Sequence, residues 1–179
     1  MAVKEETRKL TLRQREGRAI NAVAELLRRT LSVPNIYLEP PAALISADVL
    51  AVDRGGAGDL HAVEIKLLGE GHISGPLYRR LEMIKSAHSA LMSMPAHYHY
   101  LAVQASNIAQ LRSDLSRVEL YAEDGIGRIG IIALTENGPD APTAVVVLAP
   151  ERFRVEPARL KVIEEKLLSK SRPDIEVRI

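Results

Sequence analysis

The sequence lacks cysteine and tryptophan, and its aromatic residues are limited to five tyrosines and one phenylalanine. The absence of cysteine excludes disulfide bonds, thiolate zinc sites and cysteine nucleophiles, and it is compatible with a reducing compartment. So few aromatic rings also argue against a surface on which successive unpaired bases stack. The function therefore has to come from chemistry that needs neither thiols nor a row of aromatic side chains.

Long apolar runs are also missing, since no stretch approaches the roughly 18 residues that span a membrane. Residues 1–6 lack the apolar centre of a signal peptide, so we expect a cytoplasmic protein without membrane association. With 46% apolar and 26% charged residues, the chain has the composition of a globular protein. Its 179 residues fit one domain, 1–179, with a sizeable core.

The net charge is only +1, so the overall charge does not indicate a nucleic-acid-binding protein. The first 29 residues are nevertheless basic, with eight lysines and arginines against four glutamates. A basic leading helix can meet phosphate groups, but solvated helix faces often have the same composition. Both interpretations of this segment stay open.

Hydrophobic periodicity predicts a mixed α/β domain. Thr11 can cap a first helix, in which apolar residues recur every three or four positions from Ile20 to Leu31. The turn-forming loop 53–59 suits an antiparallel hairpin between its two flanking strands. In chain order we expect a helix at 11–31, strands at 35–39, 45–52 and 60–68, a helix at 77–94, a strand at 97–104, a helix at 106–116, strands at 118–122, 129–134 and 143–148, and a helix at 157–169.

Three charged residues interrupt the two strands of this hairpin. Asp48 lies in the first strand, and Glu64 and Lys66 lie two positions apart in the second. Strand side chains alternate, so Glu64 and Lys66 project from one face, and the hairpin brings Asp48 to the same point. A charge within a core sheet is costly unless it is paired or bound to a metal. The alternatives are a solvated face, or a lysine that only neutralises the two acids in a domain without a nucleic-acid role.

These residues and their order resemble the PD-(D/E)XK nuclease superfamily. Asp48 matches the first acid of the family motif, with Ala47 where a proline often stands, and Glu64 and Lys66 match the closing acid-x-lysine. The resemblance implies an α/β fold with a restriction-endonuclease-like core of helix, three strands, helix and strand over about 11–104. The additional C-terminal strands and helix, about 105–179, would then form an extension for dimerisation or target specificity.

The family resemblance also implies a function, a metal-dependent endonuclease that hydrolyses phosphodiester bonds of DNA. Asp48, Glu64 and the backbone carbonyl of Ile65 would bind Mg²⁺, or Mn²⁺ in its place, because such ions prefer oxygen ligands. Lys66 would orient the attacking water and stabilise the developing negative charge. A nuclease-fold module that binds DNA without useful catalysis is the alternative, and a homodimer is compatible with either.

Many members of the family add a glutamate from the first helix to the site. Glu16 lies one turn before Ile20 on the inward stripe, whereas Glu25 lies off that stripe near Arg28 and Arg29. We therefore expect Glu16 to be the catalytic member, with an ordinary surface glutamate as the alternative.

The helix after Lys66 supplies three further basic candidates. Arg79, Arg80 and Lys85 could bind DNA phosphates, although a basic exposed face explains them equally well.

The histidines and the loop acids are weaker candidates. His61 alternates to the opposite face from Glu64, and the pair His97 and His99 has no evident acid beside it to complete a metal site. Asp53 and Asp59 are expected to be turn residues.

Overall fold

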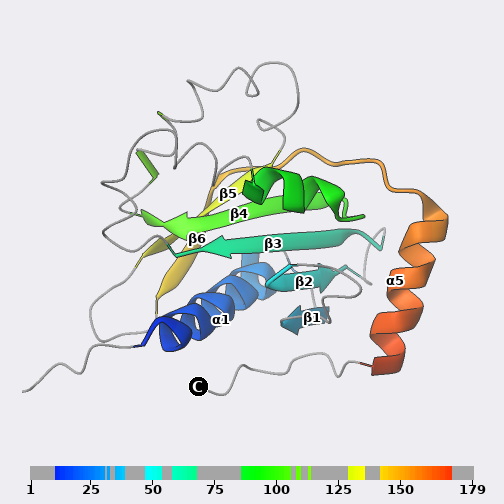
Figure 1. Ribbon diagram of the computed structural model, residues 1–179, viewed down its shortest axis with the longest axis horizontal. Helices are drawn as coiled ribbons and strands as arrows, with labels where there is room; N and C mark the ends of the chain where they lie inside the picture. The colour runs from blue at the N-terminus through cyan, green and yellow to red at the C-terminus, as the bar shows by residue number, and fades with distance from the viewer. Residues whose placement is uncertain are drawn as a thin grey trace, which may run out of the picture.

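A computed structural model shows an α/β architecture built on one six-stranded mixed sheet (Figure 1). The structure describes residues 11–30, 32, 35–38, 47–53, 58–67, 86–105, 108–109, 113, 129–135 and 142–170. The expected strand at 118–122, most of the helix expected at 106–116 and the first part of the helix expected at 77–94 lie outside these residues. None of the helices in the described ranges is long and apolar enough to cross a membrane.

The sheet has the strand order β1-β2-β3-β4-β5-β6, which is also the order along the chain. Its strands are β1 (Asn35–Leu38), β2 (Val49–Val52), β3 (Leu60–Lys66), β4 (Tyr98–Gln104), β5 (Gly130–Thr135) and β6 (Thr143–Leu148). The first three strands form an antiparallel meander, β3, β4 and β5 are parallel neighbours, and β6 returns antiparallel to β5. The predicted hairpin is confirmed, because Val49 pairs with Val63 and Val52 with Leu60.

Helix α1 (Leu12–Thr30) begins and ends close to the predicted positions. Thr11 caps it through a reciprocal pair of bonds: the Gln14 N–H donates to Thr11 Oγ1, and the Thr11 N–H donates to Gln14 Oε1. This is a capping box, which satisfies backbone donors that have no partner inside the helix. Just beyond the helix, Ser32 has a positive φ of 53°, the left-handed conformation that commonly follows a helix end.

The sheet buries apolar side chains on both faces. On one face α1 contributes Ile20, Val23 and Leu27, which pack in a cluster with Val63 and Ile65 of β3. On the other face the helical residues 86–93 and helix α5 (Pro157–Lys170) contribute Ala87, Leu91 and Ile163 to a second cluster that includes Leu60 and Ala62. Figure 1 shows α5 at the opposite end of the molecule from the beginning of α1. Successive side chains of β3 enter the two clusters in turn, so this central strand packs against apolar residues on both faces of the sheet.

One expected boundary is wrong in a way that matters for the site. We expected Asp48 inside a strand at 45–52, but β2 begins at Val49 and Asp48 lies just before it. The physical reason is a change of hydrogen-bond acceptor: the N–H of Ile65 donates to the Asp48 side chain instead of to a backbone carbonyl. The paired residues of β2 therefore begin at Val49, one residue after the acid, although the Asp48 N–H still donates to the Val63 carbonyl.

Candidate functional site

Asp48 is held at the end of β3 by two hydrogen bonds. Its backbone N–H donates to the carbonyl oxygen of Val63 at 3.1 Å, and its Oδ2 accepts from the N–H of Ile65 at 2.6 Å. The N–H and C=O of one strand residue point to the same side of the strand. The Ile65 carbonyl therefore points to the side of β3 on which the Asp48 carboxylate lies.

Glu64 and Lys66 form an ion pair beside Asp48. Lys66 Nζ lies 2.5 Å from Glu64 Oε1, as expected for side chains two positions apart on one strand face. The Glu64 side chain is only 13% exposed and that of Lys66 is 37% exposed. Lys66 can therefore still reach a bound molecule, while Glu64 is largely removed from water.

The environment of Asp48 raises the pKa of its carboxyl group from 3.8 to about 6. Burial is the main cause, and the neighbouring charges of Glu64 and Glu16 raise it further. The hydrogen bond from Ile65 and the charge of Lys66 act in the opposite direction but do not compensate. A carboxylate that is costly to ionise in the metal-free protein gains most from a bound cation.

Glu16 is the fourth predicted site residue, and its charge acts on Asp48 from helix α1. It is exposed, although it lies one turn before the buried Ile20 on the inward stripe. Its effect on Asp48 is the smallest of the five causes, so Glu16 lies at the periphery of the group. Glu25, the alternative, instead pairs with Arg28 and Arg29 on the same helix.

This arrangement has the donor chemistry of a hard divalent cation. Asp48, just before β2, and Glu64 on β3 provide carboxylate oxygens, and the Ile65 carbonyl on the same side of β3 as Asp48 could add a third oxygen. Within the described residues, no three histidine, aspartate or glutamate side chains are grouped closely enough to hold a metal by themselves. Mg²⁺ keeps several waters and takes only one or two carboxylates from the protein, so Asp48 and Glu64 are the residues that could hold it.

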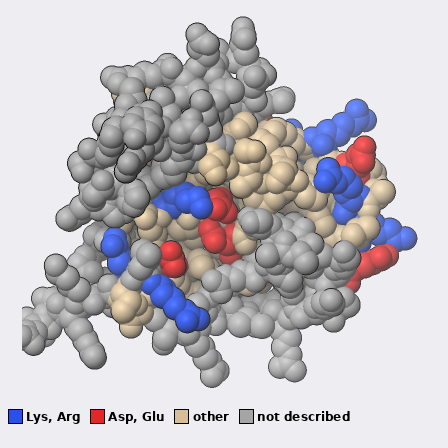
Figure 2. Space-filling view, viewed as in Figure 1, with Lys and Arg blue, Asp and Glu red and all other residues tan. Residues whose placement is uncertain are grey.

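Charged side chains of both signs gather on one face of the molecule. Figure 2 shows acidic side chains near the middle of that face, with lysine and arginine side chains next to them. The predicted phosphate-binding residues Arg79, Arg80 and Lys85 lie outside the described residues.

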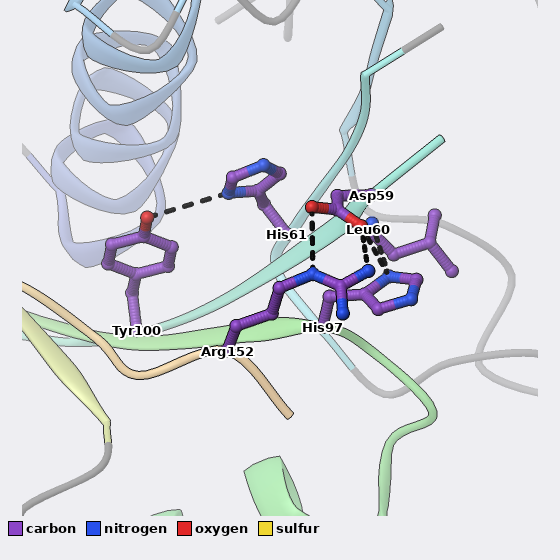
Figure 3. Close-up of polar contacts among 6 residues, drawn as sticks. All are labelled: Asp59, Leu60, His61, His97, Tyr100 and Arg152. Atoms are coloured by element: carbon purple, nitrogen blue, oxygen red, sulfur yellow. Dashed lines mark hydrogen bonds and ion pairs between the residues drawn. The ribbon is translucent and has the colours of Figure 1, made fainter. Parts of the chain in front are cut away.

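A second polar cluster lies at the other end of β3 (Figure 3), and sequence reasoning missed it. The Arg152 guanidinium donates two hydrogen bonds to Asp59, at 2.7 and 3.1 Å. Asp59 was expected to be a simple turn residue, but these bonds tie the beginning of β3 to the segment that leads into α5. The two residues are 93 positions apart, so no local sequence signal could have revealed the pair.

The histidines of this cluster are structural. Although His97 Nδ1 lies 3.6 Å from Asp59, it accepts a 3.0 Å hydrogen bond from the N–H of Leu60, so this nitrogen carries no proton to donate to the acid. Burial lowers the pKa of His97, and that of His61 to about 4. His61 stacks on Tyr98 with ring centroids 4.7 Å apart. His61 and His97 are therefore neutral, packed side chains, and His97 does not act with Asp59 as an acid–base pair.

Comparisons with known proteins bear on the fold alone. No family model matches the sequence, and no curated protein matches it. Among solved structures, the chain is similar to the SPO1766 protein of unknown function from Silicibacter pomeroyi, with a TM-score of 0.53 and 21% sequence identity. The similarity covers 90% of this chain and 86% of that one, so the shared architecture extends over nearly the whole of both proteins.

Proposed function

We propose that this protein is a metal-dependent endonuclease that hydrolyses phosphodiester bonds of DNA, with a restriction-endonuclease-like core. The observation that carries the proposal is the arrangement of Asp48, Glu64 and Lys66. Two carboxylates and an ammonium group lie together at the adjoining ends of β2 and β3, and one carboxylate is costly to ionise without a cation.

The order of the elements supports the same proposal. The chain runs through α1, the antiparallel strands β1, β2 and β3, the helical residues 86–93, and then β4, which is parallel to β3. Helix, three strands, helix, strand is the order of the PD-(D/E)XK core. Asp48 lies one residue before β2, and Glu64 and Lys66 lie within the last three residues of β3, in the order of the family's acid and acid-x-lysine.

In the proposed reaction a water oxygen forms a bond to phosphorus while the bond from phosphorus to the leaving oxygen breaks. Asp48, Glu64 and the Ile65 carbonyl would hold Mg²⁺, which supplies a more acidic bound water and neutralises phosphate charge. Lys66 has three N–H donors and uses one on Glu64. The others can orient the attacking water and donate to a phosphate oxygen as negative charge develops. The attacking water gives up one proton to solvent as it bonds to phosphorus, and the leaving oxygen takes a proton from solvent.

Cleavage assays on supercoiled, linear, single-stranded and branched DNA test this function directly. We expect Mg²⁺- or Mn²⁺-dependent cleavage of at least one substrate, and its loss in Glu64→Ala and Lys66→Ala with the fold retained. Glu165→Ala, an exposed acid on α5, is the matched control and should cut normally. Magnesium-dependent cleavage that persists in Glu64→Ala would overturn the site assignment.

The Glu64–Lys66 ion pair also favours a second candidate function. Because Lys66 already engages one oxygen of Glu64 at 2.5 Å, the site could serve a DNA-binding module that performs no catalysis. Calorimetric titration with Mg²⁺ and Mn²⁺ separates the two functions. Saturable binding that disappears in Glu64→Ala supports the nuclease, whereas no binding at millimolar metal favours the module.

A further inference from the structure

Lys66 is in direct contact with one of the two carboxylates that the proposed metal site needs. Its Nζ lies 2.5 Å from Oε1 of Glu64, so neither a water molecule nor a cation fits between the two atoms. The two residues are two positions apart at the end of β3, and strand alternation places both side chains on one face of the sheet. The ammonium group of Lys66 therefore serves as the counter-charge of Glu64.

The burial of Glu64 makes this counter-charge important. The Glu64 side chain is only 13% exposed, and a carboxylate removed from water is costly unless a positive group lies beside it. Partly buried charges are also screened much less by salt than charges in open solvent. A second cation that approaches Glu64 is therefore strongly affected by the charge of Lys66.

A divalent ion and Lys66 cannot both hold Glu64 at full strength. An ion that binds either oxygen of this carboxylate comes close to the ammonium group, because Mg²⁺ makes short bonds to its oxygen ligands. Like charges that lie close together repel each other strongly where water is scarce. Ion binding therefore weakens the bond between Lys66 and Glu64, and this bond weakens ion binding by the same free energy.

The Lys66 side chain can leave Glu64 without disturbing the sheet. It is 37% exposed, and its backbone is in register with Val103 of the parallel strand β4. Lysine carries its charge on a flexible stem with three rotatable donors, so the ammonium group can turn away while the strand stays in place. On the basis of the metal-dependent function proposed above, we propose that Lys66 competes with the divalent cation for Glu64, and that ion binding opens the Lys66–Glu64 bond and frees the ammonium group for the phosphate.

Calorimetric titration of Mg²⁺ and Mn²⁺ into the wild type and two variants at pH 7.5 tests the competition without measuring activity. Lys66→Met removes the charge but keeps the length of the stem, so it should bind either metal at least about fivefold more tightly. Lys66→Arg keeps the charge and should bind like the wild type. The matched control is Lys161→Met, which removes an exposed lysine that pairs with Glu165 on α5, and its metal affinity should be unchanged.

NMR on the wild-type protein tests the opening of the bond directly. In protein labelled with ¹⁵N-lysine, the signal of the Lys66 ammonium group is identified by its loss in Lys66→Arg. Addition of Mg²⁺ should shift this signal with the dissociation constant found by calorimetry, and the Lys161 signal should stay in place. A Lys66 signal that does not respond to bound Mg²⁺ would show that the bond stays closed and would overturn the proposal.

Equal or weaker metal binding by Lys66→Met would also overturn the competition, and weaker binding would mean that Lys66 positions Glu64 for the metal. Tighter binding by Lys66→Arg would show that the charge is not responsible. Circular dichroism checks that each variant is folded, and Lys66→Gln replaces Lys66→Met if the latter is not. Failure here is distinguishable from failure of the proposed function: if no protein of the series binds metal, both are wrong, whereas equal affinities in a wild type that cleaves DNA refute the competition alone. Affinities in the expected order without any cleavage support the competition and refute the nuclease.

Discussion

The N–H of Ile65 donates a 2.6 Å hydrogen bond to Oδ2 of Asp48, where the backbone pairing of β2 with β3 ends. The Asp48 side chain thus accepts the bond from the Ile65 N–H that a backbone carbonyl accepts in a regular antiparallel pair. The bond holds the carboxylate against β3, close to both Glu64 and the Ile65 carbonyl. This bond explains how Asp48, which lies just before β2, is held beside Glu64 and Lys66 on β3.

Asp48→Asn should stabilise the metal-free protein at neutral pH. The folded protein holds the Asp48 proton up to about pH 6, whereas the unfolded chain releases it near 3.8, so the stability present below pH 3.8 is lost as pH rises through about 6. Asparagine removes this loss, and its oxygen can still accept from Ile65. Thermal unfolding with EDTA should show a higher melting temperature for the variant at pH 7.5 and a smaller difference at pH 4.

Asp48→Ala is the control for that experiment. It removes the charge but also leaves the Ile65 N–H without its acceptor, which costs about 1–3 kcal/mol for a buried group. We therefore expect Asp48→Ala to be less stable than Asp48→Asn at pH 7.5. Equal melting temperatures of the two variants would show that the hydrogen bond contributes nothing.

His61→Gln should make the protein less sensitive to acid. Burial lowers the pKa of His61 from 6.5 to about 4, so the unfolded chain binds a proton that the folded protein does not bind between these values. Stability is therefore lost as pH falls from 6.5 to about 4. Urea unfolding at pH 7, 5.5 and 4.5 in an Asp48→Asn background, which removes the opposing titration, should show a shallower decline for His61→Gln. The burial of His97 and His99 lowers their pKa values too, so part of the decline should remain.

Mg²⁺ should stabilise the wild-type protein, because a ligand that binds only the folded state shifts the folding equilibrium by mass action. At 100 times the dissociation constant this effect is about 2.7 kcal/mol. The melting temperature at pH 7.5 should therefore rise with Mg²⁺ in the wild type and not in Glu64→Gln, which keeps the shape of the side chain without its charge. A rise of equal size in both proteins would place the metal elsewhere.

Arg152→Ala should lower the melting temperature, since it removes both hydrogen bonds to Asp59 and leaves a largely buried carboxylate without its main partner. Arg154→Ala, an exposed arginine two positions along, should have no effect. Arg152→Lys should be intermediate, because lysine keeps the charge but cannot form the two-pronged contact. Equal melting temperatures for Arg152→Ala and Arg154→Ala would show that the link does not stabilise the fold.

Much of the fold near the site could be predicted because the controlling interactions are local. The three- and four-residue spacing from Ile20 to Leu27 specifies the buried side of α1, and the turn-forming loop between β2 and β3 specifies the hairpin. Alternation along β3 then places Glu64 and Lys66 on one face. The beginning of β2 was predicted wrongly, because side-chain and backbone acceptors for the Ile65 N–H are indistinguishable in a hydrophobicity pattern.

By itself, the sequence determined the residue types of the site and the pairing of Glu64 with Lys66, because both depend on neighbours within one hairpin. The helical stripe also pointed to Glu16, but only the tertiary structure decided how weakly its charge acts on Asp48, and that Asp59 joins Arg152. It also decided how costly Asp48 is to ionise, because desolvation and neighbouring charges depend on what the folded chain packs around a group. Contacts between distant segments arise only when loop closure and core packing bring those segments together.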